Sequence, residues 1–184
     1  MSKVFTPQAI LSYPHLFEPT LPPNATEPVY SCSLVFSAGT DLSELKKAAL
    51  EAAQEKFGTK TESLLRDGKL RMPFRSDIED KGYPEGSVFM NVKNKAQPGI
   101  VSIFAGPDGK PTPITDPSLI YAGCKVRASL RAYAYDTAGN KGVAFSLGNL
   151  QKLGDGDRLD GRVRAEDEFD ADLSAKPADL DDIL

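Results

Sequence analysis

The stretch from Tyr121 to Asp136, YAGCKVRASLRAYAYD, constrains the fold of this chain more than any other. Apolar or small residues occupy every second position from Cys124 to Ala134. Because side chains alternate between the two faces of a β-strand, this pattern predicts a half-buried strand. The face turned away from the core would then carry Lys125, Arg127, Ser129, Arg131, Tyr133 and Tyr135.

Cations and tyrosines in register on one open face suit a nucleic-acid strand. Basic side chains can hold the phosphate backbone, and aromatic rings can stack on unpaired bases. The same alternation is also typical of any half-buried antiparallel strand, in which Tyr is simply a good strand former. The pattern favours a single-stranded nucleic-acid binding surface, and the rest of the chain has to support or weaken that hypothesis.

A second stretch, Ser87 to Lys95, repeats the pattern. Its apolar face carries Val88, Met90 and Val92, and its other face carries Phe89, Asn91, Lys93 and Lys95. Alternation alone does not explain why aromatic and basic residues again fill the open face. The candidate contacts from this stretch are Phe89, Lys93 and Lys95. Lys141, at the tip of a hairpin predicted by the turn-forming residues 136–142, is a further candidate.

The remaining pattern predicts a mainly β fold. Further strands are predicted over residues 6–18, 29–36, 100–104 and 143–150, with a bend or bulge at Pro14. Asp41 to Phe57 is the principal helix, with a capping box at Asp41 and Glu44 and a stop at Gly58. Residues 59–87 and 106–117 are predicted connections. The short strands, the single helix and the lack of βαβ units indicate an OB-fold-like antiparallel barrel.

Charge divides the chain of 184 residues into two parts. Residues 166–184 hold eight acidic residues and one lysine, giving −7, whereas residues 1–165 hold 18 acidic and 21 basic residues, giving +3. We therefore predict a binding domain over residues 1–165 and a disordered acidic tail over residues 166–184. The tail ends with Asp179, Asp181, Asp182, Ile183 and Leu184, a pattern typical of a short motif that docks on a partner protein.

The residue types argue against catalysis. His15 is the only histidine, and with Cys32 and Cys124 it supplies three of the four ligands of a usual zinc site. The sequence has neither a phosphate-binding loop nor a dinucleotide fingerprint. We expect no enzyme, no catalytic residue, no cofactor and no metal. Both cysteines lie in apolar strand-like runs and are expected to be buried thiols, although the sequence leaves a bridge between them open.

Neither a membrane span nor a secretory signal is evident. No apolar run approaches about 18 residues, and the N-terminus lacks the apolar core of a signal peptide. A cytoplasmic location is therefore expected.

Four segments are distinctive, namely SYPHLFEP at 12–19, KNKAQPGIV at 93–101, YAGCKVRASLRAYAYDTAGNKGVAFSLGNLQKL at 121–153 and GRVRAEDEF at 161–169. Together they resemble a known family, the phage OB-fold single-stranded-DNA-binding proteins. The resemblance covers roughly residues 3–170. It implies an OB fold, sequence-tolerant binding of single-stranded DNA, and a role in phage replication or recombination in the cytoplasm of an infected bacterium. Lys125, Arg127, Arg131, Tyr133 and Tyr135 are the DNA contacts that it implies most directly.

The acidic tail is similar in kind to the tails with which other replication single-strand binders recruit proteins. The resemblance thus makes phage or host replication proteins the expected partners of the tail, which here ends in Ile183 and Leu184 where the others end in an aromatic residue.

A second class of function stays open at this point. The chain could be a protein-interaction or virion-associated module whose acidic tail is the working part. The two classes differ in one observable, because only the first predicts oligonucleotide binding at low salt.

Overall fold

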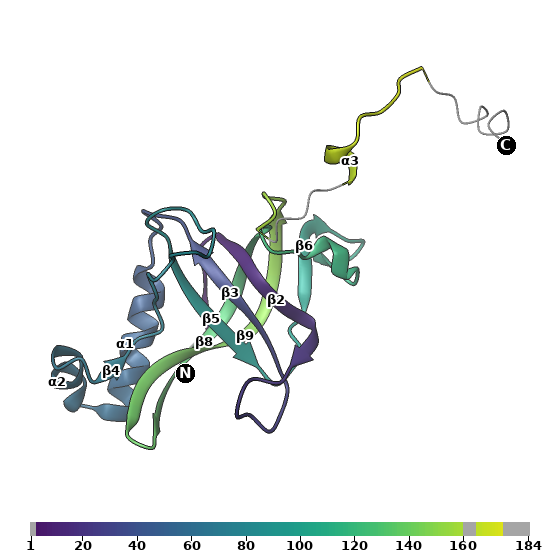
Figure 1. Ribbon diagram of the computed structural model, residues 1–184. Helices are drawn as coiled ribbons and strands as arrows, with labels where there is room; N and C mark the ends of the chain where they lie inside the picture. The colour runs from purple at the N-terminus through teal and green to yellow at the C-terminus, as the bar shows by residue number, and fades with distance from the viewer. Residues whose placement is uncertain (1–2, 160–164, 175–184) are drawn as a thin grey trace.

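The computed structural model describes residues 3–159 and 165–174, and it shows a mainly β chain (Figure 1). The strands are β1 (Lys3–Phe5), β2 (Ala9–Thr20), β3 (Val29–Phe36), β4 (Leu70–Arg71), β5 (Val88–Asn94), β6 (Ile100–Ala105), β7 (Pro111–Pro113), β8 (Lys125–Thr137) and β9 (Asn140–Gly154). The helices are α1 (Ser43–Phe57), α2 (Lys60–Arg66), the short 3₁₀ turn η1 (Pro117–Leu119) and α3 (Ala165–Glu168). The prediction of a β-rich fold with one principal helix is confirmed.

The strand pairings run in a circuit. β8 pairs with β2, β2 with β3, β3 with β5, β5 with β9, and β9 again with β8. β1 adds to β8, while β4 and β6 add to β9 and β7 adds to β6. The prediction of antiparallel pairing is confirmed for β8 with β9 and for the pairings of β1, β2, β3 and β7, and it is wrong for β4, β5 and β6, which each pair in parallel with β9.

The hairpin of β8 and β9 is the longest element of the sheet, and it curves along the molecule in Figure 1. Its register runs from Thr137 paired with Asn140 to Lys125 paired with Gly154. Ala138 and Gly139 form the turn with φ of 51° and 84°. Two successive positive φ angles are typical of the turn that matches the twist of two antiparallel strands. The predicted hairpin is therefore confirmed.

The core lies between the inner face of the sheet and α1. Alternate residues of β8, from Val126 to Ala132, are buried together with Leu34 and Phe145. α1 packs against β1, β8 and β9, and its buried residues are Leu45, Ala49, Ala52 and Ala53. The helix ends at Gly58 as predicted, where φ is 57° and the amide donates to the Gln54 carbonyl. It begins at Ser43, whose amide donates to Asp41 Oδ1 over 3.0 Å.

Three short elements lie in segments where the sequence predicted only connections. They are α2 and β4 within residues 59–87 and β7 within residues 106–117. α2 carries charges of both signs and no long apolar stripe, so periodicity gave no signal for it. Tertiary contact fixes it instead, since the buried Thr61 donates its hydroxyl to the carbonyl of Ala53 in α1 over 3.2 Å.

Both cysteines are buried and carry free thiols, as expected. Burial raises the pKa of the Cys32 thiol to about 12, and it also raises the pKa of the Cys124 thiol. Both groups are therefore protonated, inert core residues near neutral pH.

The acidic tail is described only over residues 166–174, of which 166–168 belong to α3. Asp179, Asp181, Asp182, Ile183 and Leu184 lie outside the described residues. The predicted boundary at residue 165 stays a prediction.

Residues 155–158 cross close over Gly123, and this contact gives a stability prediction. Gly123 has φ of 115°, and a Cβ there would overlap the carbonyl oxygen of Asp157. Gly139 also has positive φ, 84°, but has no atom within 4 Å of the same position. We expect Gly139→Ala to cost about 1 kcal/mol of unfolding free energy from backbone strain alone. Gly123→Ala should cost about 1–3 kcal/mol more through overpacking.

Urea unfolding of the two variants measures this difference. Equal costs would contradict the close crossing of residues 155–158 over Gly123.

Candidate nucleic-acid interface

A row of polar residues crosses the outer face of the sheet. Paired residues on neighbouring strands lie on the same face, so the register shows which side chains line up. From β2 to β1 the row reads His15, Ser31, Lys93, Ser146, Arg131 and Lys3. None of the six is buried. The fold therefore brings three cations, from β5, β8 and β1, into one row.

A groove of about 750 Å³ lies over the middle of this row. One wall is the connection between β2 and β3, from Pro22 to Val29, and the other is formed by β5, β8 and β9. Four of the predicted contact residues line it, namely Lys93, Lys95, Arg131 and Tyr133. The groove joins residues that the chain separates by about 40 positions, so it exists only because β9 lies between β5 and β8.

A smaller hollow of about 80 Å³ shares Asn94, Arg131 and Ser146 with the groove. Lys3 lines this hollow from β1. The Asn94 side chain donates to the Leu147 carbonyl over 2.8 Å and so ties β5 to β9 beneath both spaces. The polar floor is thus held by the sheet itself.

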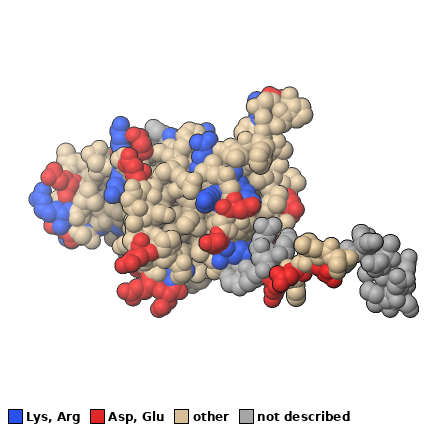
Figure 2. Space-filling model, turned by 90° about the horizontal axis from the view of Figure 1, so that it is seen from above, with Lys and Arg blue, Asp and Glu red and all other residues tan. Residues whose placement is uncertain are grey.

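The charge along this surface is mainly positive. Lys3, Lys93, Lys95 and Arg131 line the two spaces, and Glu27 is the acidic residue among the lining residues. Glu27 pairs with Lys95 over 2.5 Å, which ties the β2–β3 connection to the end of β5. The hydrogen bond to Lys95 lowers the pKa of the Glu27 carboxyl below its ordinary value. Elsewhere the charges are mixed, and Figure 2 shows acidic and basic residues interspersed on the face seen from above.

Tyr133 supplies the aromatic surface of the groove. It is half-buried, and its cross-strand neighbour on β9 is the small Ala144. Burial raises the pKa of the Tyr133 phenol, with the nearby Tyr135 adding to the effect. The ring is therefore neutral near pH 7 and offers an apolar face beside the cations.

Other predicted residues of β8 and β9 lie outside the groove. Lys125 and Arg127 are exposed nearer β6, where Arg127 Nε donates to Gln151 Oε1 over 2.7 Å. Tyr135 and Lys141 lie toward the hairpin tip. A Cβ at Gly142 would overlap the Tyr135 hydroxyl, and Lys141 pairs with Asp136 over 3.8 Å. The structure thus gathers four of the nine predicted contacts in one groove and distributes four others around it.

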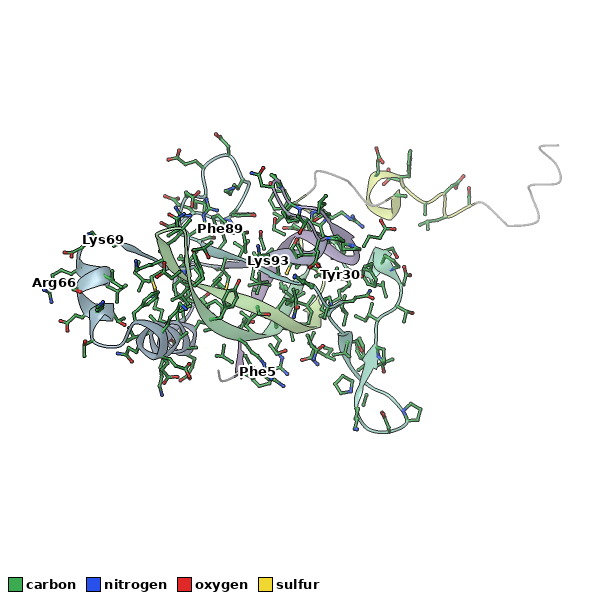
Figure 3. All side chains as sticks on the ribbon, turned by 90° about the horizontal axis from the view of Figure 1, so that it is seen from below. Phe5, Tyr30, Arg66, Lys69, Phe89 and Lys93 are labelled. Atoms are coloured by element: carbon green, nitrogen blue, oxygen red, sulfur yellow. The ribbon has the colours of Figure 1, made fainter. Side chains whose placement is uncertain are left out.

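Phe89 is a correction. The sequence placed its ring on the open face, but only 2% of the residue is exposed. Its ring packs edge-on against Tyr83 at 5.5 Å, with the Arg75 guanidinium 5.1 Å from its centroid. Phe89 and Lys93, both labelled in Figure 3, lie on the same strand, yet the connection before β5 covers only the Phe89 end. The prediction that the Phe89 ring stacks on a base is therefore wrong.

Sequence reasoning missed Lys3 and the wall formed by residues 22–29. Lys3 lies in a strand of three residues, too short for periodicity to indicate. The wall contains Pro22, Pro23 and Pro28, which indicate a stiff connection but give no signal for a role in binding. The exposed Asn24 has φ of 63°, a value that asparagine tolerates better than most residues.

Residues 3–159 and 165–174 contain neither a membrane-spanning helix nor a cluster of metal-ligating side chains. No helix there is long and apolar enough to cross a membrane. No three His, Cys, Asp or Glu residues of that part of the chain gather as metal ligands.

Comparison with known proteins gives a family match over nearly the whole chain. The model of the family described as "Enterobacter phage Enc34, ssDNA-binding protein" matches residues 2–182. A curated relative, protein p50 of Acyrthosiphon pisum secondary endosymbiont phage 1, is 32% identical over 176 residues, which cover 89% of this chain and 90% of p50.

Two solved structures share the fold. The single-stranded DNA-binding protein of bacteriophage Enc34 in complex with ssDNA aligns with a TM-score of 0.60 at 20% identity, over 85% of this chain and 88% of that one. The single-stranded DNA-binding protein gp2.5 of bacteriophage T7 aligns with a TM-score of 0.62 at 13% identity, over 90% of this chain and 99% of that one.

Proposed function

The chain belongs to the family of the Enterobacter phage Enc34 ssDNA-binding protein, and from this premise we propose that it binds single-stranded DNA in the groove beside β5 and β8. The observation that carries the proposal is the convergence of Lys93, Lys95 and Arg131 with the ring of Tyr133 in one groove. Cations bind the phosphate groups of an unpaired strand, and an aromatic ring stacks on its exposed bases. The groove supplies both kinds of group.

The proposed binding is tolerant of sequence. Lys93 and Arg131 lie in one row and would hold successive phosphates, while Tyr133 would stack on a base. Every base has an aromatic face, so stacking does not select among sequences. Duplex DNA keeps its bases stacked on one another, so the ring would favour single strands.

The proposed biological role is in phage DNA replication or recombination, in the cytoplasm of the infected bacterium. There the protein would protect single strands and recruit phage or host replication proteins through residues 179–184. Support comes from the family and from the likeness to gp2.5 of bacteriophage T7, a single-stranded DNA-binding protein. The circuit of strand pairings is compatible with an OB-type barrel, which we propose as the architecture behind this role.

The first test concerns the cations. Arg131→Ala removes a charge from the centre of the row, so we expect affinity for an oligothymidine to fall by about 1 kcal/mol. The loss of one phosphate contact should also flatten the dependence of log affinity on log salt by about 0.7. Fluorescence anisotropy titrations at several salt concentrations measure both quantities.

The matched control for this test is Arg66→Ala on α2, which removes an exposed arginine that pairs with Glu62. Affinity and slope should stay unchanged there. Arg127→Ala reports whether the bound strand continues along β8 toward β6. If wild-type protein bound no oligonucleotide at low salt, the protein-interaction or virion-associated function would replace the proposed one.

The second test concerns the ring. Tyr133→Ala should weaken binding of oligo-dT, oligo-dA and oligo-dC alike, by about 1–3 kcal/mol, because it removes the stacking surface. Tyr133→Phe keeps the ring and should bind like the wild type. A loss confined to one base, or an equal loss in both variants, would contradict sequence-tolerant stacking.

The third test concerns the acidic tail. Its charge of −7 can compete with DNA for the basic groove. Removing residues 166–184 should therefore tighten DNA binding, most strongly at low salt where screening is weak. Equal affinities with and without the tail, measured by anisotropy at about 20 mM and 200 mM salt, would leave it a tether for partner proteins alone.

A further inference from the structure

Strand β2 is interrupted at Tyr13. Its pairing with β3 shifts between Ser12 and His15, and Tyr13 has φ of 45°. A positive φ is strained for a bulky residue, and such outliers cluster at functional sites. The consequence here is that the Tyr13 side chain stands 59% exposed in a strand whose neighbours Leu11 and Leu16 are fully buried.

A second cavity, of about 470 Å³, opens beside this bulge. It is distinct from the groove described above and shares no lining residue with it. Tyr13 and Tyr121 line it together with Lys81 and Arg158, and none of its lining residues is acidic. In a chain of net charge −4, a hollow with two rings, two cations and no carboxylate in its lining selects for an anion that carries an aromatic group.

The walls of this cavity are held in place. The Tyr121 hydroxyl donates to Asp155 over 3.0 Å and accepts from the Gly156 amide over 3.1 Å. The Arg158 guanidinium lies 4.6 Å from the Tyr121 ring centroid, and the Lys81 ammonium lies 5.2 Å from that of Phe89. Both cations therefore rest on buried or half-buried rings, which fixes their charges at the cavity.

We propose that this cavity is a second subsite for single-stranded DNA, in which a base stacks on Tyr13 and its phosphates lie near Lys81 and Arg158. The inference rests on the proposed function and extends it to a part of the surface outside the groove. It also gives a role to the covered end of β5, because the Phe89 ring that is lost as a stacking surface supports Lys81 instead.

The two sites lie along the same strand. β2 runs from the bulge at Tyr13 toward Pro22, where the wall of the groove begins. Because of its bulges, β2 from Ser12 to Thr20 lies opposite only the four residue steps of β3 from Ser33 to Val29, which is roughly 13 Å, and the groove wall begins beyond Thr20. The exposed His15 lies between them, in the row that contains Lys93. A strand of four nucleotides is taken up by the groove of about 750 Å³, whereas one of about 15 can occupy the groove and also reach Tyr13.

The length of the oligonucleotide separates the two sites experimentally. Tyr13→Ala should weaken binding of dT15 by about fivefold or more, while Tyr13→Phe should bind like the wild type. Lys81→Gln should flatten the salt dependence for dT15 by about 0.7, which a purely structural role would not do. For dT4, held in the groove, both variants should match the wild type.

The control is Phe5→Ala, which removes a ring that is 63% exposed and lines neither cavity. Equal thermal midpoints verify that the variants are folded. If dT15 affinity is unchanged in Tyr13→Ala while Arg131→Ala weakens it, DNA binding stands and the second subsite is overturned. If Tyr13→Ala changes only the effect of removing residues 166–184, the cavity binds an acidic peptide and the inference is likewise overturned. If the wild type binds neither oligonucleotide, both proposals fail together.

Discussion

The pairing of β8 with β9 is the interaction on which the rest of the sheet depends. These two strands supply a partner to β1, β2, β4, β5 and β6, and β3 and β7 attach through those neighbours. The alternation of apolar and polar residues along β8 determines the composition of both faces of the strand. Val126, Ala128, Leu130 and Ala132 are buried in the core, whereas Arg127 and Arg131 between them are exposed on the other face, where the half-buried Tyr133 follows. Stability and the proposed binding surface therefore arise from a single strand pattern, and a shift of register by one residue would exchange them.

A bulge in β9 divides the basic residues of β8 into two groups. Ala128 pairs with Leu150 and Leu130 with Leu147, so β9 holds one more residue than β8 at this point. Ser129 stabilises the irregularity, because its hydroxyl accepts from the Asn149 amide over 2.9 Å. Bulges turn a strand locally and redirect its side chains. On one side of the bulge Arg131 meets Ser146 and the groove, and on the other side Arg127 meets Gln151 and β6.

The sequence predicted individual strands and the helix well, but it predicted poorly which distant parts of the chain come into contact. The hairpin, the helix ending at Gly58 and the alternation at 124–134 are local signals, and they are confirmed except at Ser129, which was expected on the open face and is buried. The burial of Phe89 is not local. It depends on Tyr83, which donates its hydroxyl to Ser12 over 2.9 Å across 71 positions of sequence. The convergence of Lys93 with Arg131 depends equally on the parallel pairing of β5 with β9, which no periodicity reports.

The outer face of β5 changes character within one short strand. At one end Phe89 and its β3 neighbour Val35 are buried in a second apolar cluster under Tyr83. Two residues on, Asn91 accepts a hydrogen bond from Ser33, and two residues further Lys93 is exposed beside Ser31. The covered end gives the sheet a second packed layer that stiffens it. The open end can then present its cations without large rearrangement. The strand that carries them is packed on both faces at Phe89, four residues before Lys93. Rigid placement of this kind lowers the entropy cost of binding a flexible polymer, since only the polymer has to be ordered.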